Sequence, residues 1–129
     1  NQASTYHQLG NVAVKLGEYD RAKRYYQQAL DIQNEFSDRY NQASTYHKLG
    51  NIAVKLREYD RAKSYYQQAL DIKIEFSDRY SQASTYYQLG LLAQEQKNYA
   101  EVTDNLLTAL KIFIEYQDKY WADVMRAIL

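Results

Sequence analysis

The chain has 129 residues and a formal net charge of zero from 16 basic and 16 acidic residues, and it contains no cysteine or proline. The balanced charge argues against a nucleic-acid-binding surface, which needs a basic excess, and the lack of cysteine excludes disulfides and thiolate metal sites. We expect a cytoplasmic location, with which the lack of cysteine is compatible. No apolar stretch is long enough to span a membrane. The chain starts without methionine or a signal segment, and we expect it to be part of a longer repeat protein.

A segment of 40 residues recurs along the chain. Residues 1–40 return at 41–80 with 34 of 40 positions identical, and residues 81–120 share 16 of 40 positions with the second copy. Residues 121–129 begin a fourth unit. This period predicts a single array over residues 1–129, built from repeats 1–40, 41–80 and 81–120 and a terminal helix.

The first half of each copy has the apolar spacing of an α-helix. In the first copy, a core-facing stripe collects Ala3, Tyr6, Leu9, Gly10, Ala13 and Leu16. The opposite sector holds Ser4, His7, Gln8, Asn11, Val14 and Lys15. A glycine at the position of Gly10 recurs in every copy, although glycine inside a helix costs roughly 1 kcal/mol relative to alanine. We therefore expect a close contact there, with Gly10 facing Ala22.

The second half of each copy predicts another amphipathic helix. Its apolar side contains Tyr19, Ala22, Tyr25, Tyr26, Ala29, Leu30, Ile32 and Phe36. Gly17 suits the turn between the two helices because glycine accepts positive φ. Ser37-Asp38, Asp78 and Asp118 can cap the helix that follows each turn. The whole pattern predicts an all-α protein with three helical hairpins and one C-terminal helix, seven helices in total.

The joins between copies and the C-terminal part have their own features. Tyr40, Tyr80 and Tyr120 end the three copies, where we expect them to hold neighbouring units together. Phe113 replaces Lys73 on the predicted outer face of the second helix. The tail carries apolar residues at helical spacing, namely Trp121, Val124, Met125, Ile128 and Leu129. We expect this helix to cover the end of the array, with self-association through the C-terminal end as the alternative.

Aromatic and small residues recur at fixed spacing in the first two copies. In the first copy they are Tyr6, Leu9, Gly10, Tyr19, Ala22, Tyr26, Ala29 and Leu30. This pattern resembles the signature of the tetratricopeptide repeat, although Val102 and Leu106 depart from it in the third copy. The 40-residue period exceeds the common one of about 34 and resembles the long repeats of LGN/Pins-like polarity adaptors and bacterial signalling proteins. The resemblance implies a right-handed α-solenoid whose first helices line a concave groove that binds a peptide or helical segment of a partner protein.

The polar sector of the first helices supplies the candidate groove residues. They are Ser4, His7, Gln8, Asn11, Lys15, Ser44, His47, Lys48, Asn51 and Lys55, with Tyr87 and Leu91 in the third copy. Asparagine can hold a peptide backbone through its donor and its acceptor, and the lysines favour an acidic ligand or a C-terminal carboxylate. If so, alanine at Asn11 and Asn51 should abolish partner capture without lowering stability. The alternative is a solvated face that recurs only because the repeat was duplicated.

Other functions find little support in the sequence. His7 and His47 lie on neighbouring first helices, but no cysteine or third histidine completes a zinc site. Motifs for catalysis or for phosphate binding are absent. We therefore expect a protein-interaction scaffold that is not an enzyme and has no cofactor or metal. The alternative is a structural spacer or self-association segment of a larger signalling protein.

Overall fold

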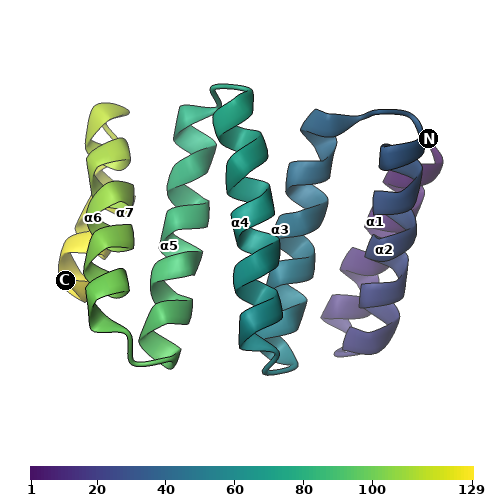
Figure 1. Ribbon diagram of the computed structural model, residues 1–129, viewed down its shortest axis with the longest axis horizontal. Coiled ribbons are helices and arrows are strands. Elements are labelled where there is room, and N and C mark those ends of the chain that lie inside the picture. Colours follow the sequence, from purple (N-terminus) through teal and green to yellow (C-terminus); the bar gives the residue numbers. More distant parts are fainter. The chain divides into compact units, whose positions relative to one another are not determined.

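The computed structural model describes residues 1–129, and all its regular elements are α-helices (Figure 1). They are α1 (Gln2–Lys15), α2 (Tyr19–Glu35), α3 (Arg39–Lys55), α4 (Tyr59–Glu75), α5 (Arg79–Glu95), α6 (Tyr99–Glu115) and α7 (Lys119–Ile128). The predicted all-α class with seven helices is confirmed. None of these helices combines the length and the apolar character that a membrane span requires.

The chain divides into two compact units, Asn1–Ile72 (unit 1) and Lys73–Leu129 (unit 2). In unit 1, α1 and α2 form a hairpin and α3 packs on α2. The part of α4 in unit 1 packs on α3, where Tyr66 lies beside Gly50. In unit 2, α5 and α6 form a hairpin and α7 packs on α6. Unit 1 therefore contains the first hairpin, α3 and most of α4, and unit 2 contains the end of α4, one complete hairpin and α7.

All six turns between the helices share one backbone geometry. The residue after each C-cap has a φ between 54° and 73°, and these residues are Gly17, Ser37, Arg57, Ser77, Lys97 and Gln117. The next amide donates to a carbonyl five residues back, as Glu18 N does to Ala13 O at 2.9 Å. This is the Schellman motif, which ends a helix with one left-handed residue. The prediction of a tight turn at Gly17 is confirmed, and the other turns hold a side chain in the left-handed region.

The recurring glycines make room for a large side chain. A Cβ atom on Gly10 would lie 2.7 Å from Cε1 of Tyr26, so this tyrosine is its nearest neighbour, and the expected contact with Ala22 stays a prediction. Gly50 is related to Tyr66 in the same way, with a distance of 2.6 Å. Both tyrosines are only 1% exposed. The glycine thus lets a whole aromatic ring pass beneath the first helix of the hairpin.

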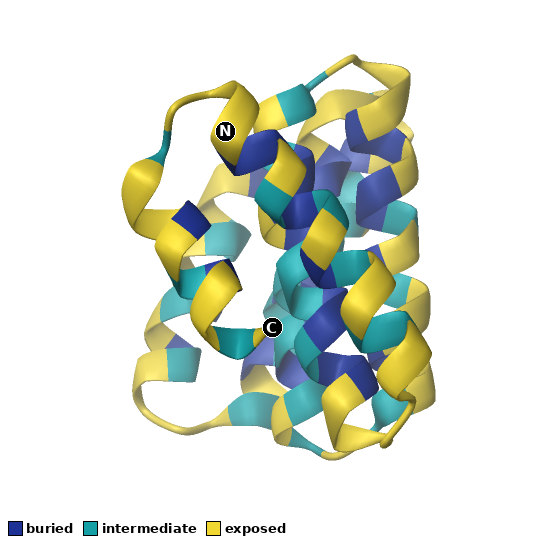
Figure 2. Cartoon of the chain, turned by 90° about the vertical axis from the view of Figure 1, so that its left-hand side faces the viewer, coloured by how far each residue is buried: buried dark blue, intermediate teal, exposed yellow.

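The apolar stripe is buried less completely on α1 than on α3. Figure 2 colours the chain by how far each residue is buried. Leu9 is 40% exposed and Leu16 is 66% exposed, whereas Leu49 is 1% exposed. Leu49 belongs to a core with Ala13 and Tyr26 because α3 lies against the α1–α2 hairpin. Within unit 1, α1 packs on α2. The prediction that Leu9 and Leu16 lie in the core is therefore wrong, although the position of Leu9 is buried one repeat later, in Leu49.

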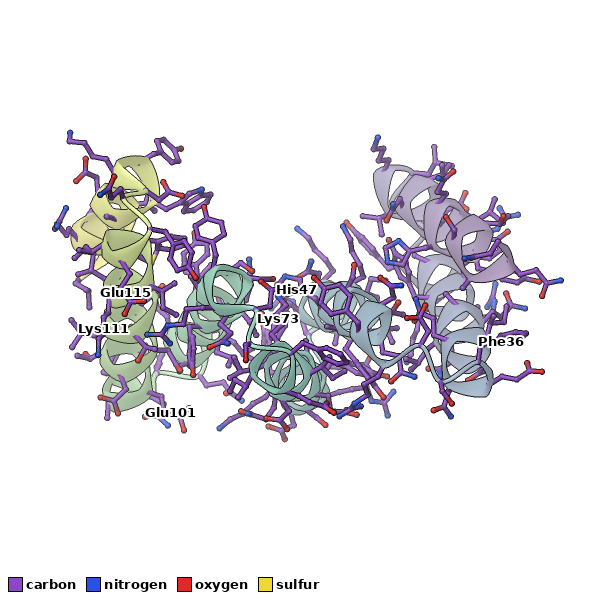
Figure 3. All side chains as sticks on the ribbon, turned by 90° about the horizontal axis from the view of Figure 1, so that it is seen from above. Phe36, His47, Lys73, Glu101, Lys111 and Glu115 are labelled. Atoms are coloured by element: carbon purple, nitrogen blue, oxygen red, sulfur yellow. The ribbon has the colours of Figure 1, made fainter.

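Position 33 of the repeat is buried, which contradicts the prediction that Lys73 and Phe113 lie on the outer face. Gln33 and Lys73 are each 7% exposed, and Phe113 is 4% exposed. In unit 1, Thr45 Oγ1 donates to Gln33 Oε1 at 2.8 Å. In unit 2, Lys73 Nζ extends from the end of α4 toward α5 and donates to Thr85 Oγ1 at 2.8 Å (Figure 3). This position therefore joins each hairpin to the first helix that follows it.

In unit 2, the joint between α6 and α7 is apolar. Ala122 is 3% exposed and Met125 is fully buried, and both belong to one core with Phe113. Met125 stands where Thr45 and Thr85 stand in the earlier copies. The polar partners of the earlier joints are thus replaced together by Phe113 and Met125.

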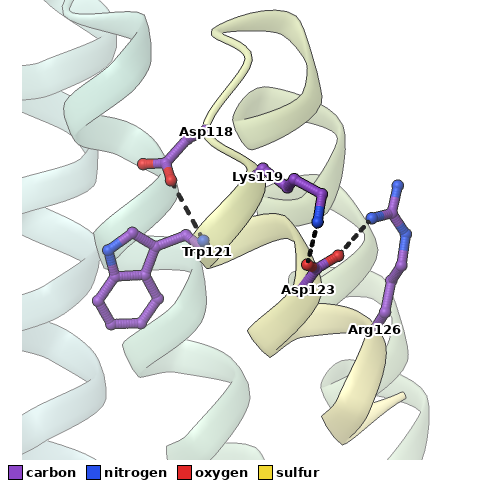
Figure 4. A network of polar contacts seen from close by, with 5 residues as sticks. All are labelled: Asp118, Lys119, Trp121, Asp123 and Arg126. Carbon is purple, nitrogen blue, oxygen red and sulfur yellow. Dashed lines mark hydrogen bonds and ion pairs between the residues drawn. The ribbon is translucent and has the colours of Figure 1, made fainter.

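Only the last of the predicted aspartate caps forms a side-chain bond to its helix. Asp118 accepts a hydrogen bond from the backbone N–H of Trp121 at 3.2 Å (Figure 4). Asp38 and Asp78 hold the N-cap positions of α3 and α5 but make no such bond. Asp38 instead accepts from Nδ2 of Asn41 at 2.9 Å. The predicted location of the caps is thus right for all three, and the predicted capping bond is right only for Asp118.

Candidate binding groove

The polar faces of α1 and α3 line two adjoining pockets in unit 1. The first pocket, of about 440 Å³, includes Ser4, His7, Gln8, Asn11, Asp38, Asn41 and Ser44 among its lining residues. The second, of about 340 Å³, includes Asn11, Lys15, Tyr26, Lys48, Asn51 and Lys55. Asn11 lines both, so the pockets form one surface, which we call the α1–α3 groove. All the groove residues predicted for the first two copies except His47 line it.

Each groove asparagine is held by a buried tyrosine of its own hairpin. Tyr66 Oη donates to Oδ1 of Asn51 at 2.6 Å, and the Tyr26 hydroxyl donates to Oδ1 of Asn11. Burial raises the pKa of Tyr26 to about 12 and also raises the pKa of Tyr66. Both phenols therefore remain protonated donors at neutral pH. With each amide oxygen engaged, the Nδ2 donor is the group that each asparagine offers to a ligand.

These hydrogen bonds argue against the expectation that Asn11 and Asn51 can be replaced by alanine without loss of stability. Alanine would leave the hydroxyl of Tyr26 or Tyr66 buried without its acceptor. An unsatisfied buried hydroxyl lowers stability by about 1–3 kcal/mol. The asparagines therefore belong to the packing of the hairpin as well as to the groove surface.

Three lysines determine the charge of the second pocket. Lys15 and Lys55 are exposed and Lys48 is half-buried. No carboxylate side chain lines this pocket. Ammonium groups and asparagine Nδ2 groups are all hydrogen-bond donors, and such donors bind carboxylate oxygens more strongly than neutral acceptors. The second pocket is therefore suited to a ligand that carries a carboxylate.

His7 lies in the first pocket, between the two helices. Its Nε2 is 3.5 Å from Oγ of Ser44 on α3, and its ring meets Tyr26 edge-on with the centroids 5.1 Å apart. Burial, followed by the charge of Lys48, lowers the pKa of His7 below its ordinary value of 6.5. His7 is therefore neutral at neutral pH, with one ring nitrogen as donor and the other as acceptor.

His47 lines neither pocket, although it occupies the position of His7 in the second copy. It is half-buried, and its ring meets Tyr66 edge-on with the centroids 5.4 Å apart. This contact lies within its own hairpin. The predicted contact of His47 with a ligand stays a prediction. No group of three His, Cys, Asp or Glu side chains in the chain is arranged to hold a metal ion.

In unit 2, the equivalent face of α5 has a different chemistry. Tyr87 and Leu91 stand where His7 and Asn11 stand in the first copy, and both are half-buried. The Tyr87 ring lies 5.6 Å from the ring of Trp121 on α7. Leu91 offers no hydrogen-bonding group. This face therefore presents aromatic and aliphatic carbon in place of amide and imidazole.

Sequence reasoning missed the part that the buried tyrosines play in the groove. The helical wheel assigned Tyr26 and Tyr66 to the core, and it did not connect them with the asparagines 15 residues earlier. A signal was present in the repeat itself. Asn11 and Tyr26 both become leucine in the third copy, as Leu91 and Leu106. This joint change agrees with their contact, although 24 of the 40 positions differ between the second and third copies.

Comparison with known proteins identifies the kind of repeat. The family model described as "Tetratricopeptide repeat" matches residues 1–75. A search of curated proteins found no similar sequence.

Solved structures resemble the chain over most of its length. The crystal structure of BtubC (BKLC) from P. vanneervenii matches with a TM-score of 0.79 and 20% identity, over 95% of this chain and 59% of that one. The N-terminal domain of stress-induced protein-1 (STI-1) from C. elegans has a TM-score of 0.77 and 17% identity, over 97% and 92%. Aspartyl phosphate phosphatase F from Bacillus subtilis has a TM-score of 0.84 and 18% identity, over 89% and 30%. At these identities, the similarity shows the helical-repeat fold alone.

Proposed function

Since the chain belongs to the tetratricopeptide repeat family, whose repeats serve as protein-interaction scaffolds, we propose that its α1–α3 groove captures an acidic peptide segment of a partner protein. One observation carries the proposal. The second pocket combines Lys15, Lys48 and Lys55 with Asn11 and Asn51, and no carboxylate side chain lines it. A side-chain or C-terminal carboxylate of the partner would meet only donors there.

The buried tyrosines support this choice of ligand. Because Tyr26 and Tyr66 each donate to an asparagine Oδ1, Asn11 and Asn51 are held in place with the Nδ2 group available as a donor. Donors of this kind can also hold the backbone carbonyls of an extended peptide without reading its side chains. The lysines of the groove would then select a negatively charged ligand, and the asparagine amides would bind the backbone of the peptide.

The third copy indicates that the fold does not require this polar face. The α5–α6 hairpin folds with Leu91 and Leu106 where the first hairpin has Asn11 and Tyr26. A hairpin of this family can therefore close without the amide–phenol pair. We accordingly assign the pair in unit 1 to ligand recognition as well as to packing.

We extend the proposal to α5, to the other polar residues of α1 and α3, and to the location of the chain. Tyr87 and Leu91 on α5 contact an apolar side chain of the partner, and Ser4, His7, Gln8, Ser44 and His47 supply further polar contacts. The chain acts without catalysis or a cofactor, in the cytoplasm, as an array of the long 40-residue type. A spacer or self-association segment would have the same fold but would show no selective binding of acidic peptides.

Fluorescence anisotropy with a labelled pentapeptide tests the proposal. The probe is Ala-Glu-Glu-Leu-Asp with a free C-terminal carboxylate, and the neutral comparison is Ala-Gln-Gln-Leu-Asn amide. We expect the acidic probe to bind with a Kd in the micromolar range and the neutral one to bind at least tenfold more weakly, a difference of about 1.4 kcal/mol.

A matched pair of variants separates the effect of the groove lysines from the effect of net charge. Gln at Lys15, Lys48 and Lys55 should weaken binding of the acidic probe at least tenfold. Gln at three unit 2 lysines (Lys97, Lys111 and Lys119) changes the net charge equally and should leave binding unchanged. Equal loss in both triple variants, or no binding of the acidic probe by the unaltered chain, would refute the proposal.

A further inference from the structure

One side of α6 carries exposed side chains at helical spacing. They are Ala100, Asp104, Leu107, Lys111 and Ile114, which we call the α6 stripe. At 100° per residue they fall within a sector of about 80°, and they span about 21 Å along the helix. Leu107 is 49% exposed and Ile114 is 51% exposed, so two aliphatic side chains of the stripe are in contact with water.

The earlier copies expose the centre of the same stripe but place a polar side chain there. Gln27 and Gln67 stand where Leu107 stands in the third copy. Further helices follow α2 and α4 along the chain, and still both glutamines are exposed. The exposure of this position therefore belongs to the hairpin itself, and the third copy puts an aliphatic side chain on it.

The order of residues makes the α6 stripe complementary to itself in the reverse direction. In an antiparallel pair of α6 helices from two molecules, with the two-fold axis at Leu107, each Leu107 meets its own counterpart. Ala100 then lies opposite Ile114, which places a small side chain against a large one. Asp104 lies opposite Lys111, and the symmetry produces this pair of opposite charges twice.

Only α6 combines an apolar centre with opposite charges on both sides of it. The first copy has opposite charges at the two flanking positions, Arg24 and Asp31, but Gln27 lies between them. The second copy has Ser64 and Asp71 at these positions, which carry only one charge. The self-complementary order is therefore not a feature that the repeat imposes on every second helix.

The charged side chains of the α6 stripe are placed to pair with a second molecule. Asp104 and Lys111 are both exposed. Thr108 Oγ1 donates to the backbone oxygen of Asp104 and not to its carboxylate. Glu115, one turn after Lys111, already forms a two-point ion pair with Arg79, with Nε 3.2 Å from Oε2 and Nη2 3.1 Å from Oε1.

We propose that the α6 stripe is a homodimer interface, in which it packs antiparallel against the α6 stripe of a second molecule of this chain. The second molecule is the occupant that the stripe itself specifies, because its charges and its small and large side chains stand in the mirrored order. The contact is small, so the dimer is weak, with a Kd on the order of 100 μM. The groove residues lie on other helices, so the dimer does not depend on the groove ligand.

Sedimentation equilibrium of the full chain between about 10 μM and 1 mM tests the proposal. The average mass should rise with concentration from that of one chain toward that of two. Leu107→Gln restores the residue of the earlier copies, so it should fold, and it should weaken the dimer at least tenfold. Ile74→Gln changes a side chain on α4 that is 50% exposed, and it should leave the dimer intact. The mass of one chain at every concentration, or equal weakening by both variants, would overturn the proposal.

Charge reversal tests the antiparallel order. Asp104→Lys places two cations opposite each other, and Lys111→Asp places two carboxylates opposite each other, so each variant alone should be monomeric. A mixture of the two variants should dimerise, because each one then meets the opposite charge on the other. Both side chains are exposed, so both variants should fold. A mixture that stays monomeric, or single variants that dimerise as the unaltered chain does, would contradict the antiparallel interface.

A cysteine on the two-fold axis tests the register. The chain has no cysteine, so Leu107→Cys supplies one thiol for each molecule. The two thiols should meet at the axis and form a disulfide-linked dimer under mild oxidation. Gln27→Cys, at the same position of the first copy, is the matched control and should cross-link at least tenfold more slowly. Equal rates for the two variants would show that Leu107 does not lie at an interface.

Discussion

The α1–α2 hairpin of unit 1 and the α5–α6 hairpin of unit 2 have corresponding helices and the same turn geometry, yet they differ in the chemistry between their helices. In the first, the Tyr26 ring fills the space at Gly10 and its hydroxyl reaches Asn11. In the other, Leu106 fills the space at Gly90, and Leu91 replaces the asparagine. The hairpin therefore needs a bulky side chain at this place and does not need a polar one.

The joints that follow these two hairpins differ in the same coordinated way. Gln33 and Thr45 form a buried hydrogen bond in unit 1, whereas Phe113 and Met125 share an apolar core in unit 2. A buried polar group needs its partner, and an apolar neighbour cannot supply one. The two positions are therefore coupled, and a change at one of them alone should be costly.

The largest effect is expected from breaking the apolar joint. Phe113→Gln should lower the free energy of unfolding by roughly 3–5 kcal/mol, because it removes a buried ring and leaves an amide beside Met125. Met125→Thr should cost about 1 kcal/mol less in the Phe113→Gln background than in the unaltered chain, through the bond that Thr45 makes to Gln33. Urea denaturation followed by circular dichroism measures the single and double variants. Equal costs of Met125→Thr in the two backgrounds would show that the two positions are not coupled.

The glycine contacts sharpen the comparison of the two hairpins. Gly10→Ala should lower the free energy of unfolding by roughly 1–3 kcal/mol, because a rigid tyrosine ring must move. Gly90→Ala should change it by less than about 1 kcal/mol, because the end of Leu106 can rotate away and alanine favours the helix. Urea denaturation measures both changes. Equal losses in the free energy of unfolding would mean that the Tyr26 ring moves aside as easily as the Leu106 side chain.

Lys73 and Thr85 form a third joint, in which a charged group takes the place of Gln33 or Phe113. The pH dependence of stability tests this joint. Burial lowers the pKa of Lys73 from its ordinary 10.5 to about 8, partly offset by Asp78. Between these values the unfolded chain binds more protons than the folded chain, so stability should rise with pH from about 8 toward 10. Above about pH 10, ionisation of tyrosines in the unfolded chain opposes this gain.

Removing the buried charge should abolish the pH dependence of the joint. Lys73→Met should remove the rise in stability above pH 8, while at pH 7 the loss of the hydrogen bond to Thr85 offsets the gain from removing the buried charge. Lys111→Met, at an exposed lysine of unit 2, is the control and should keep the rise. The contrary outcome is a Lys73→Met curve parallel to that of the unaltered chain between pH 7 and 10, which would mean that Lys73 titrates normally.

The smallest effect is expected at the turns of the two hairpins. Lys97 holds a φ of 59° where the first hairpin has Gly17 at 73°. Lys97→Gly should raise the free energy of unfolding by about 0.5–1 kcal/mol, because glycine adopts this conformation without strain. Gly17→Lys should lower it by a similar amount. Changes of the same sign in both variants would contradict this account of the turns.

Periodicity made the helices, their number and the face that holds the groove predictable from the sequence. The periodicity could not show how deeply each residue is buried. The helical wheel places Leu9 and Leu49 on the same face of their helices. Leu49 is buried because its face packs against the α1–α2 hairpin. Lys73 was placed outside because lysine is usually exposed, and its hydrogen bond to Thr85 depends on a residue in another helix. The tyrosine bond to Asn11 was missed for the same reason, since a wheel treats each helix alone.

The measurement that tests the central claim most directly transplants the pair of the third hairpin into the first. The variant carries Asn11→Leu together with Tyr26→Leu and is compared with the unaltered chain for unfolding temperature and for binding of Ala-Glu-Glu-Leu-Asp. The account predicts a folded protein of similar stability whose affinity for the acidic peptide falls at least tenfold. A folded variant that binds the peptide as tightly as the unaltered chain would show that the amide fixed by Tyr26 has no part in recognition.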